Sequence, residues 1–186
     1  MSRTARLRVL LVLPLLLGGC AAQGAASASR HAGNMSMPSG AAARPPQTAT
    51  MVCGAEIKGK VKQVLSLPSD PPTSATWANS VYTCRYSLPM GPMTLTVQVL
   101  PSAAQAGTTL DRDEAAAAGA QPLAGLGQRA WGTPAGTVSV LKDDQILTVD
   151  TTGLPEVFGA NDQKRTDLAY EVASDVLGCW TGDGDE

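Results

Sequence analysis

Two segments of alternating side chains, residues 81–88 and 93–100, constrain the fold of this chain most strongly. Both are rich in β-branched and aromatic residues, and the turn-forming residues 89–92, Pro-Met-Gly-Pro, separate them. In the second segment apolar side chains alternate with Thr and Gln, which is typical of a strand with one buried face. The pattern predicts an antiparallel hairpin.

A second hairpin and three helices are expected around the first hairpin. The second hairpin has strands at residues 137–141 and 145–151, with an optional lead strand at 128–132. Residues 66–76 contain three prolines and are expected to form a loop. The helices are expected at residues 52–65, at residues 102–119 and after a cap at Asn161 or Asp162. Ser102 and Gln105 have capping-box spacing, which predicts a cap at Ser102.

The last helix carries an inward stripe of apolar residues: Leu168, Ala169, Val172, Val176 and Cys179. The element order is therefore α-ββ-α-ββ(β)-α. Hairpins separated and flanked by helices favour an α+β fold, with an antiparallel sheet built from two hairpins and the helices packed on one face. A parallel doubly wound sheet is not indicated.

The amino terminus has the features of an export signal. Three arginines precede a short apolar run that ends in Leu17-Gly18-Gly19-Cys20. This sequence resembles the lipobox of bacterial lipoproteins, which implies a diacylglyceryl group on the Cys20 thiol, cleavage before Cys20, and acylation of the new amine by a fatty acid such as palmitate. The alternative is an ordinary secretory signal that happens to end in Cys.

The lipobox divides the chain into four parts. Residues 1–19 are expected to be the signal peptide, and residues 20–50 the lipidated Cys and a disordered tether of Ala, Ser, Gly and Pro. Residues 51–182 are long enough for a single domain, and residues 183–186 form an acidic tail. The predicted location is the extracytoplasmic face of the cell membrane, held there by lipid.

Charge excludes nucleic acid as a leading partner. The whole chain has a net charge of −2, and removal of residues 1–19 leaves 11 basic and 16 acidic side chains, a net charge of −5. A nucleic-acid-binding domain normally carries clustered Lys and Arg, whereas this one is acidic. For the same reason, attachment to the membrane is expected to be lipidic and not electrostatic.

The tether contains one set of soft metal ligands. His31, Met35 and Met37 lie close together in the sequence and are of the types that bind Cu(I). Copper binding is therefore an alternative function, but the pattern occurs once and does not repeat.

The domain resembles small actinobacterial surface lipoproteins of unknown function. The resemblance covers most of residues 51–180 and depends on Cys53, on Tyr-Thr-Cys-Arg-Tyr at 82–86, and on Gly-Leu-Gly-Gln-Arg-Ala-Trp at 125–131. These families imply no settled activity, so no catalytic residue is carried over. They do imply a disulfide between Cys53 and Cys84.

Cys179 is the third cysteine of the domain. With Cys53 and Cys84 paired, it is left as a thiol, and its place on the inward stripe predicts a buried, unreactive side chain. A disulfide between Cys53 and Cys179 is the main alternative. A zinc site is not expected, because no pair has the C-x-x-C spacing and the domain contains no His.

The absence of His after position 31 bears most directly on function. Serine and cysteine nucleophiles commonly rely on a His base, so a standard catalytic triad is excluded. We therefore expect a non-catalytic binding or interaction module of the cell envelope, without a cofactor or metal, whose partner is an envelope protein or ligand. The alternative is an envelope enzyme that uses carboxylates, for which the candidates are Asp111, Asp113, Glu114, Asp143 and Asp144.

The lipobox predicts the effect of one substitution. Cys20→Ser removes the acyl acceptor, so the variant should be released from membranes or retained as the uncleaved precursor. Mass spectrometry of the wild-type mature amino terminus tests the same premise, and an unmodified Cys20 there would contradict it.

Overall fold

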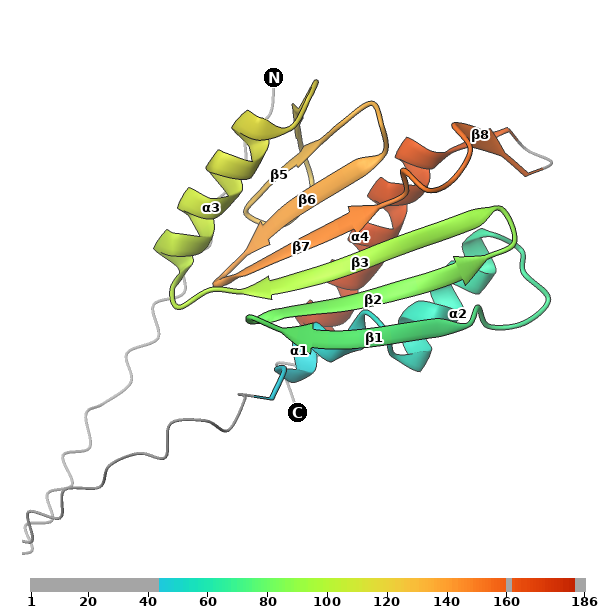
Figure 1. The fold of residues 1–186 in the computed structure, drawn as a ribbon, viewed down its shortest axis with the longest axis horizontal. Coiled ribbons are helices and arrows are strands. Elements are labelled where there is room, and N and C mark those ends of the chain that lie inside the picture. Colours follow the sequence, from blue (N-terminus) through green and yellow to red (C-terminus); the bar gives the residue numbers. More distant parts are fainter. Residues whose placement is uncertain (1–43, 160–161, 183–186) are drawn as a thin grey trace, which may run out of the picture. The chain divides into compact units, whose positions relative to one another are not determined.

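The computed structural model describes residues 44–159 and 162–182 (Figure 1). In these residues seven strands form one antiparallel sheet in the order β1-β2-β3-β7-β6-β5-β4. The strands are β1 (Thr73–Ala78), β2 (Val81–Leu88), β3 (Gly91–Val99), β4 (Gln121–Leu123), β5 (Arg129–Gly132), β6 (Thr137–Lys142) and β7 (Gln145–Asp150). The α+β class and the antiparallel sheet agree with the sequence prediction.

Both predicted hairpins are present, and they are joined side by side. Strands β2 and β3 form the first, and β6 and β7 form the second. Pairing of β3 with β7, from Thr94↔Asp150 to Val99↔Gln145, links the hairpins at the centre of the sheet. The predicted lead strand corresponds to β5, which pairs with β6.

Two strands at the sheet edges were not predicted. Strand β1 occupies part of the segment expected to be a loop, and β4 is short. The side chains of β1 are mostly small and exposed, so they give no alternating apolar signal. Asn79 and Ser80, with φ angles of 52° and 60°, form the tight turn that reverses the chain into β2.

The helices cover both faces of the sheet, which corrects the prediction of a single helical layer. Helices α1 (Gln47–Met51), α2 (Ala55–Val64) and α4 (Arg165–Gly182) share one apolar core with the sheet, and Figure 1 shows α2 and α4 behind the strands. Helix α3 (Ala103–Ala116) packs in a separate cluster that contains Leu110, Leu141 and Ile146.

Alternation along β6 and β7 explains the second helical layer. Val140 and Leu147 belong to the core beneath α4, whereas their neighbours Leu141 and Ile146 point to the opposite face. Because both faces of this hairpin are apolar, both need a cover. Helix α3 covers the second face. Its N-terminus is capped as predicted, since the Ser102 hydroxyl accepts a hydrogen bond from the Gln105 N–H at 3.3 Å.

The folded region begins before residue 51, so the predicted tether extended too far. Ala49 of α1 is fully buried, and the Thr48 carbonyl accepts a hydrogen bond from the Trp180 indole at 3.0 Å. A five-residue helix gives little periodic signal, and its formation depends on these contacts with distant residues. The predicted first helix corresponds to α2, which is shorter at both ends.

The last helix starts later than predicted. Residues 163–164 pair as strand β9 (Gln163–Lys164) with β8 (Val157–Phe158), and α4 follows at Arg165. Asp162 is therefore not its cap, and Asn161 lies outside the described residues.

Cys179 occupies a different place on α4 from the one predicted. Four residues of the predicted stripe are buried, but Cys179 is half-buried and Trp180 takes the buried position. A stripe that passes through Val172 and Val176 continues at Trp180, because residues four apart lie on the same face of a helix. Cys179 lies to one side of it.

The disulfide implied by the resemblance is present. Cys53 and Cys84 are bonded, with 5.5 Å between their Cα atoms and a sequence separation of 31 residues. The bond attaches the segment between α1 and α2 to β2. Next to it, the buried Tyr86 hydroxyl donates a hydrogen bond of 2.5 Å to the Val52 carbonyl, and burial raises the pKa of this tyrosine. The N-terminal helices are thus attached to the sheet at two neighbouring points.

Removal of the disulfide should destabilise the domain far more than removal of the third cysteine. Closing a loop of this length contributes about 3.5 kcal/mol on the chain-entropy estimate. The double variant Cys53→Ala/Cys84→Ala should therefore melt roughly 10 °C or more below the wild type in thermal unfolding followed by circular dichroism. Cys179→Ala, the matched control, should cost about 1 kcal/mol. Equal melting temperatures for the double variant and the wild type would contradict this account.

Candidate functional site

Two cavities lie alongside α4 where its outward side chains meet β4, β5 and the loop between these strands. We call the first the loop pocket; it has a volume of about 500 Å³ and is lined by Gly125, Leu126, Gly127, Gln128, Lys142, Ser174, Leu177 and Gly178. We call the second the strand pocket; it has a volume of about 450 Å³ and is lined by Gly119, Gln121, Leu123, Gly132, Thr133, Pro134, Val138, Thr166, Asp167 and Tyr170. Both volumes are in the range of small-molecule sites.

One face of α4 forms a wall of both cavities. Asp167, Tyr170, Ser174, Leu177 and Gly178 follow one another at spacings that place them on the same side of the helix. The rise of an α-helix makes this wall roughly 17 Å long. We call the two cavities together the groove along α4.

Tyr170 divides the groove. Its hydroxyl donates a hydrogen bond of 3.1 Å to the Ala124 carbonyl at the start of the β4–β5 loop. A Cβ atom on Gly125 would lie 3.2 Å from the same hydroxyl, so glycine lets the loop approach the ring closely. The two cavities are therefore separated by Tyr170, which is held by this one hydrogen bond and is 38% exposed.

The other end of the loop is held on the β6–β7 hairpin. The Gln128 N–H donates to the Leu141 carbonyl at 2.9 Å, and the Gln128 side-chain oxygen accepts from the Asp143 N–H at 2.8 Å. Gly127 has a φ of +51°, and a Cβ there would be 2.5 Å from the Leu141 carbonyl oxygen. The loop is therefore fixed at both ends by hydrogen bonds within the chain, which define the shape of the loop pocket.

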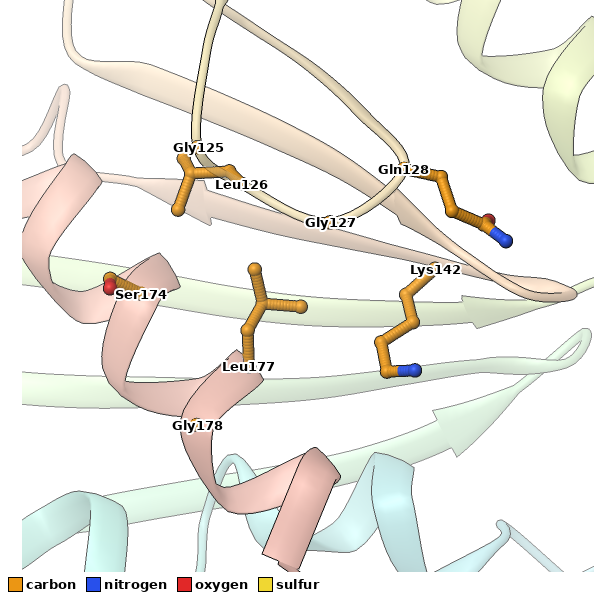
Figure 2. A pocket seen from close by; sticks show the side chains of 8 residues that line it. All are labelled: Gly125, Leu126, Gly127, Gln128, Lys142, Ser174, Leu177 and Gly178. Atoms are coloured by element: carbon orange, nitrogen blue, oxygen red, sulfur yellow. The ribbon is translucent and has the colours of Figure 1, made fainter. Parts of the chain in front are cut away.

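The two pockets differ in charge. Among the described residues that line them, Lys142 is the one charged residue of the loop pocket, and Asp167 is the one charged residue of the strand pocket. Figure 2 shows Leu126 and Leu177 between Ser174 on one side and Lys142 on the other. The Lys142 ammonium is 3.1 Å from the carboxylate of Asp143, which does not line the cavity.

The carboxylates predicted as alternative catalytic groups lie elsewhere. Asp111 and Asp113 are on α3, where they form ion pairs with Arg129 and Arg112, and Glu114 is on the same helix. Asp143 and Asp144 form the turn between β6 and β7. None of the five lines the groove.

Several predicted features lie outside the described residues. These are the lipobox Leu17-Gly18-Gly19-Cys20 and the tether ligands His31, Met35 and Met37. Within the described residues, no group of three or more His, Cys, Asp or Glu side chains is arranged to hold a metal. In the same part of the chain, no helix combines the length and hydropathy required to span a bilayer.

Cys179 is a half-buried thiol on α4, outside the groove lining. Burial raises its pKa to about 11, and a hydrogen bond and the negative charge of Glu56 act in the same direction. The thiolate is the nucleophilic form of cysteine, so this thiol is unreactive near neutral pH.

The sequence alone did not indicate the groove. The segment at 125–128 enters the prediction only through a resemblance, and nothing in the sequence places it beside a helix that follows about 50 residues later. One signal was present, since Ser174, Leu177 and Gly178 form a second stripe on α4 that carries no charge. Comparisons with protein-family models, with curated proteins and with solved structures found no match for this chain.

The raised pKa of Cys179 predicts slow alkylation. At pH 8 its reaction with iodoacetamide should be roughly a hundredfold slower than that of a cysteine with an ordinary pKa, and the rate should rise with pH as the thiolate forms. Glu56→Gln removes the neighbouring negative charge and should increase the rate. Mass spectrometry of the alkylated protein measures the alkylation rates of the wild type and of Glu56→Gln. Rapid alkylation of the wild type at pH 8 would contradict the prediction.

Proposed function

We propose that this chain is a lipid-anchored binding protein on the extracytoplasmic face of the cell membrane, and that its ligand occupies the groove along α4. The lipobox sequence and the acidic, low-charge composition support the anchor and the location. The observation that carries the binding function is the preformed loop pocket of about 500 Å³. Preformed cavities with apolar walls and a few placed polar groups are characteristic of ligand sites.

The lining favours binding over carboxylate catalysis. An acid pair for glycosidase-type chemistry must converge on one cleft, at separations of roughly 5–10 Å. Among the residues that the structure describes, the lining of the loop pocket contains no carboxylate, and that of the strand pocket contains Asp167. The candidate acids instead lie on α3 or in the β6–β7 turn, with Asp111 and Asp113 paired to arginines. The groove thus offers contact surface without an evident acid–base pair.

Anchoring and binding fit together physically. Two or three acyl chains hold the protein stably at the membrane, because each buried methylene contributes about 0.8 kcal/mol. The expected tether between Cys20 and α1 allows the domain to sample a shell of the envelope roughly 30 Å deep. A binding domain on such a tether meets its ligand near the membrane surface without entering the bilayer.

Site-specific photo-crosslinking on intact cells tests the proposed site. A benzoylphenylalanine in place of Ser174, which lines the loop pocket, should give a defined crosslinked product. The matched control is the same residue in place of Ser74, which is also exposed but lies on β1 and lines neither cavity. Mass spectrometry then identifies the product. Equal crosslinking from the two positions, or none from position 174, would contradict binding in the groove.

A further inference from the structure

Gly178 lines the loop pocket from α4. It lies inside the helix, where glycine is the least favourable residue except proline. A Cβ atom at this position would meet nothing within 4 Å among the described residues. A side chain at position 178 would extend into the loop pocket, which Gly178 lines.

The walls of the loop pocket define the kind of molecule that fits. Leu126 and Leu177 form an apolar surface, which suits a compact hydrocarbon or aromatic body. Lys142 stands at one side of this surface, and its side chain is 29% exposed. An ammonium group has three donors, and the contact with Asp143 leaves donors available to a second acceptor.

We propose that the loop pocket binds a small organic anion, namely a carboxylate or comparable acid on an apolar body. This inference rests on the proposed binding function and specifies the ligand class of its site. The acid group pairs with Lys142, and the apolar body packs on Leu126 and Leu177 in the space beside Gly178. The strand pocket does not suit the same ligand, because the charged side chain in its lining is Asp167.

Asp143 has a positioning role in this arrangement. Its carboxylate accepts from Lys142 at 3.1 Å, and its backbone N–H is bound by the Gln128 side chain at 2.8 Å. The Lys142 head is thereby held next to the fixed β4–β5 loop instead of moving freely in solvent. The ligand anion then meets a cation whose position is already set, which reduces the entropy cost of binding.

A matched pair of probes tests the charge requirement. Para-trifluoromethylbenzoate carries the acid, and para-trifluoromethylbenzamide is its neutral counterpart of nearly the same shape. Each is titrated against the full lipidated chain in non-ionic detergent, and fluorine NMR line widths report binding, with protein-free micelles as the blank. The benzoate should bind roughly tenfold more tightly than the benzamide.

Two variants test the site, and each has a control. Gly178→Leu fills the pocket and should abolish binding of the benzoate, whereas Gly59→Leu, at a position in α2 where a Cβ also meets nothing within 4 Å, should leave it unchanged. Lys142→Gln should weaken the benzoate roughly tenfold and leave the benzamide unchanged. Lys58→Gln on α2 should change neither. Melting curves by circular dichroism verify that each variant is folded.

The outcomes separate this inference from the proposed function. Equal binding of the two probes by the wild type, or an unchanged benzoate affinity in Lys142→Gln, overturns the organic-anion inference. If both probes bind equally and Gly178→Leu abolishes both, the pocket binds ligands of another class, so the inference fails while the proposed function stands. Unchanged benzoate binding in folded Gly178→Leu overturns the assignment of the ligand to the loop pocket. Crosslinking from position 174 tests the proposed function independently of the ligand's charge.

Discussion

Pairing between β3 and β7 is the interaction on which the rest of the domain depends. It joins two hairpins that lie about 50 residues apart in the sequence and brings Leu95 and Val97 beside Val149 and Leu147 on one face. Neither hairpin alone has enough apolar surface for independent stability. The joined sheet has a continuous apolar face, against which α4 and the N-terminal helices pack, and the Cys53–Cys84 bond attaches those helices to β2.

The groove follows from the limited width of this helical layer. Helix α4 packs over β6 and β7, so the strands beyond them, β5 and β4, reach past the helix on that face. The loop between β4 and β5 turns back toward α4 and is held there by Tyr170 at one end and by the β6–β7 hairpin at the other. The cavities lie in the remaining space. The elements that form their walls pack against one another to stabilise the fold. In the loop pocket, Gly178 leaves space that a side chain would fill, and Lys142 supplies the charge.

Sequence patterns predicted those elements whose own residues carry the signal. The two hairpins, α3 with its Ser102 cap and the buried stripe of α4 were expected from alternation, capping and helical spacing. Strand β1 was missed because its small side chains do not alternate in polarity. The helices were expected on one face only, whereas residues 138–141 of β6 are all buried and therefore need helices on both faces of the sheet. The groove was missed because it depends on the long-range approach of residues 125–128 to α4. No local pattern contains that information.

The central proposal is that the groove along α4 binds a molecule in the proposed lipid-anchored protein. Native mass spectrometry of the lipidated chain, released gently from its own membranes, measures this most directly. The account predicts that the wild type carries a bound small molecule in addition to the mass of the lipidated polypeptide, and that the folded Gly178→Leu variant carries none. Identical masses for the two proteins, after allowance for the substitution, would contradict it.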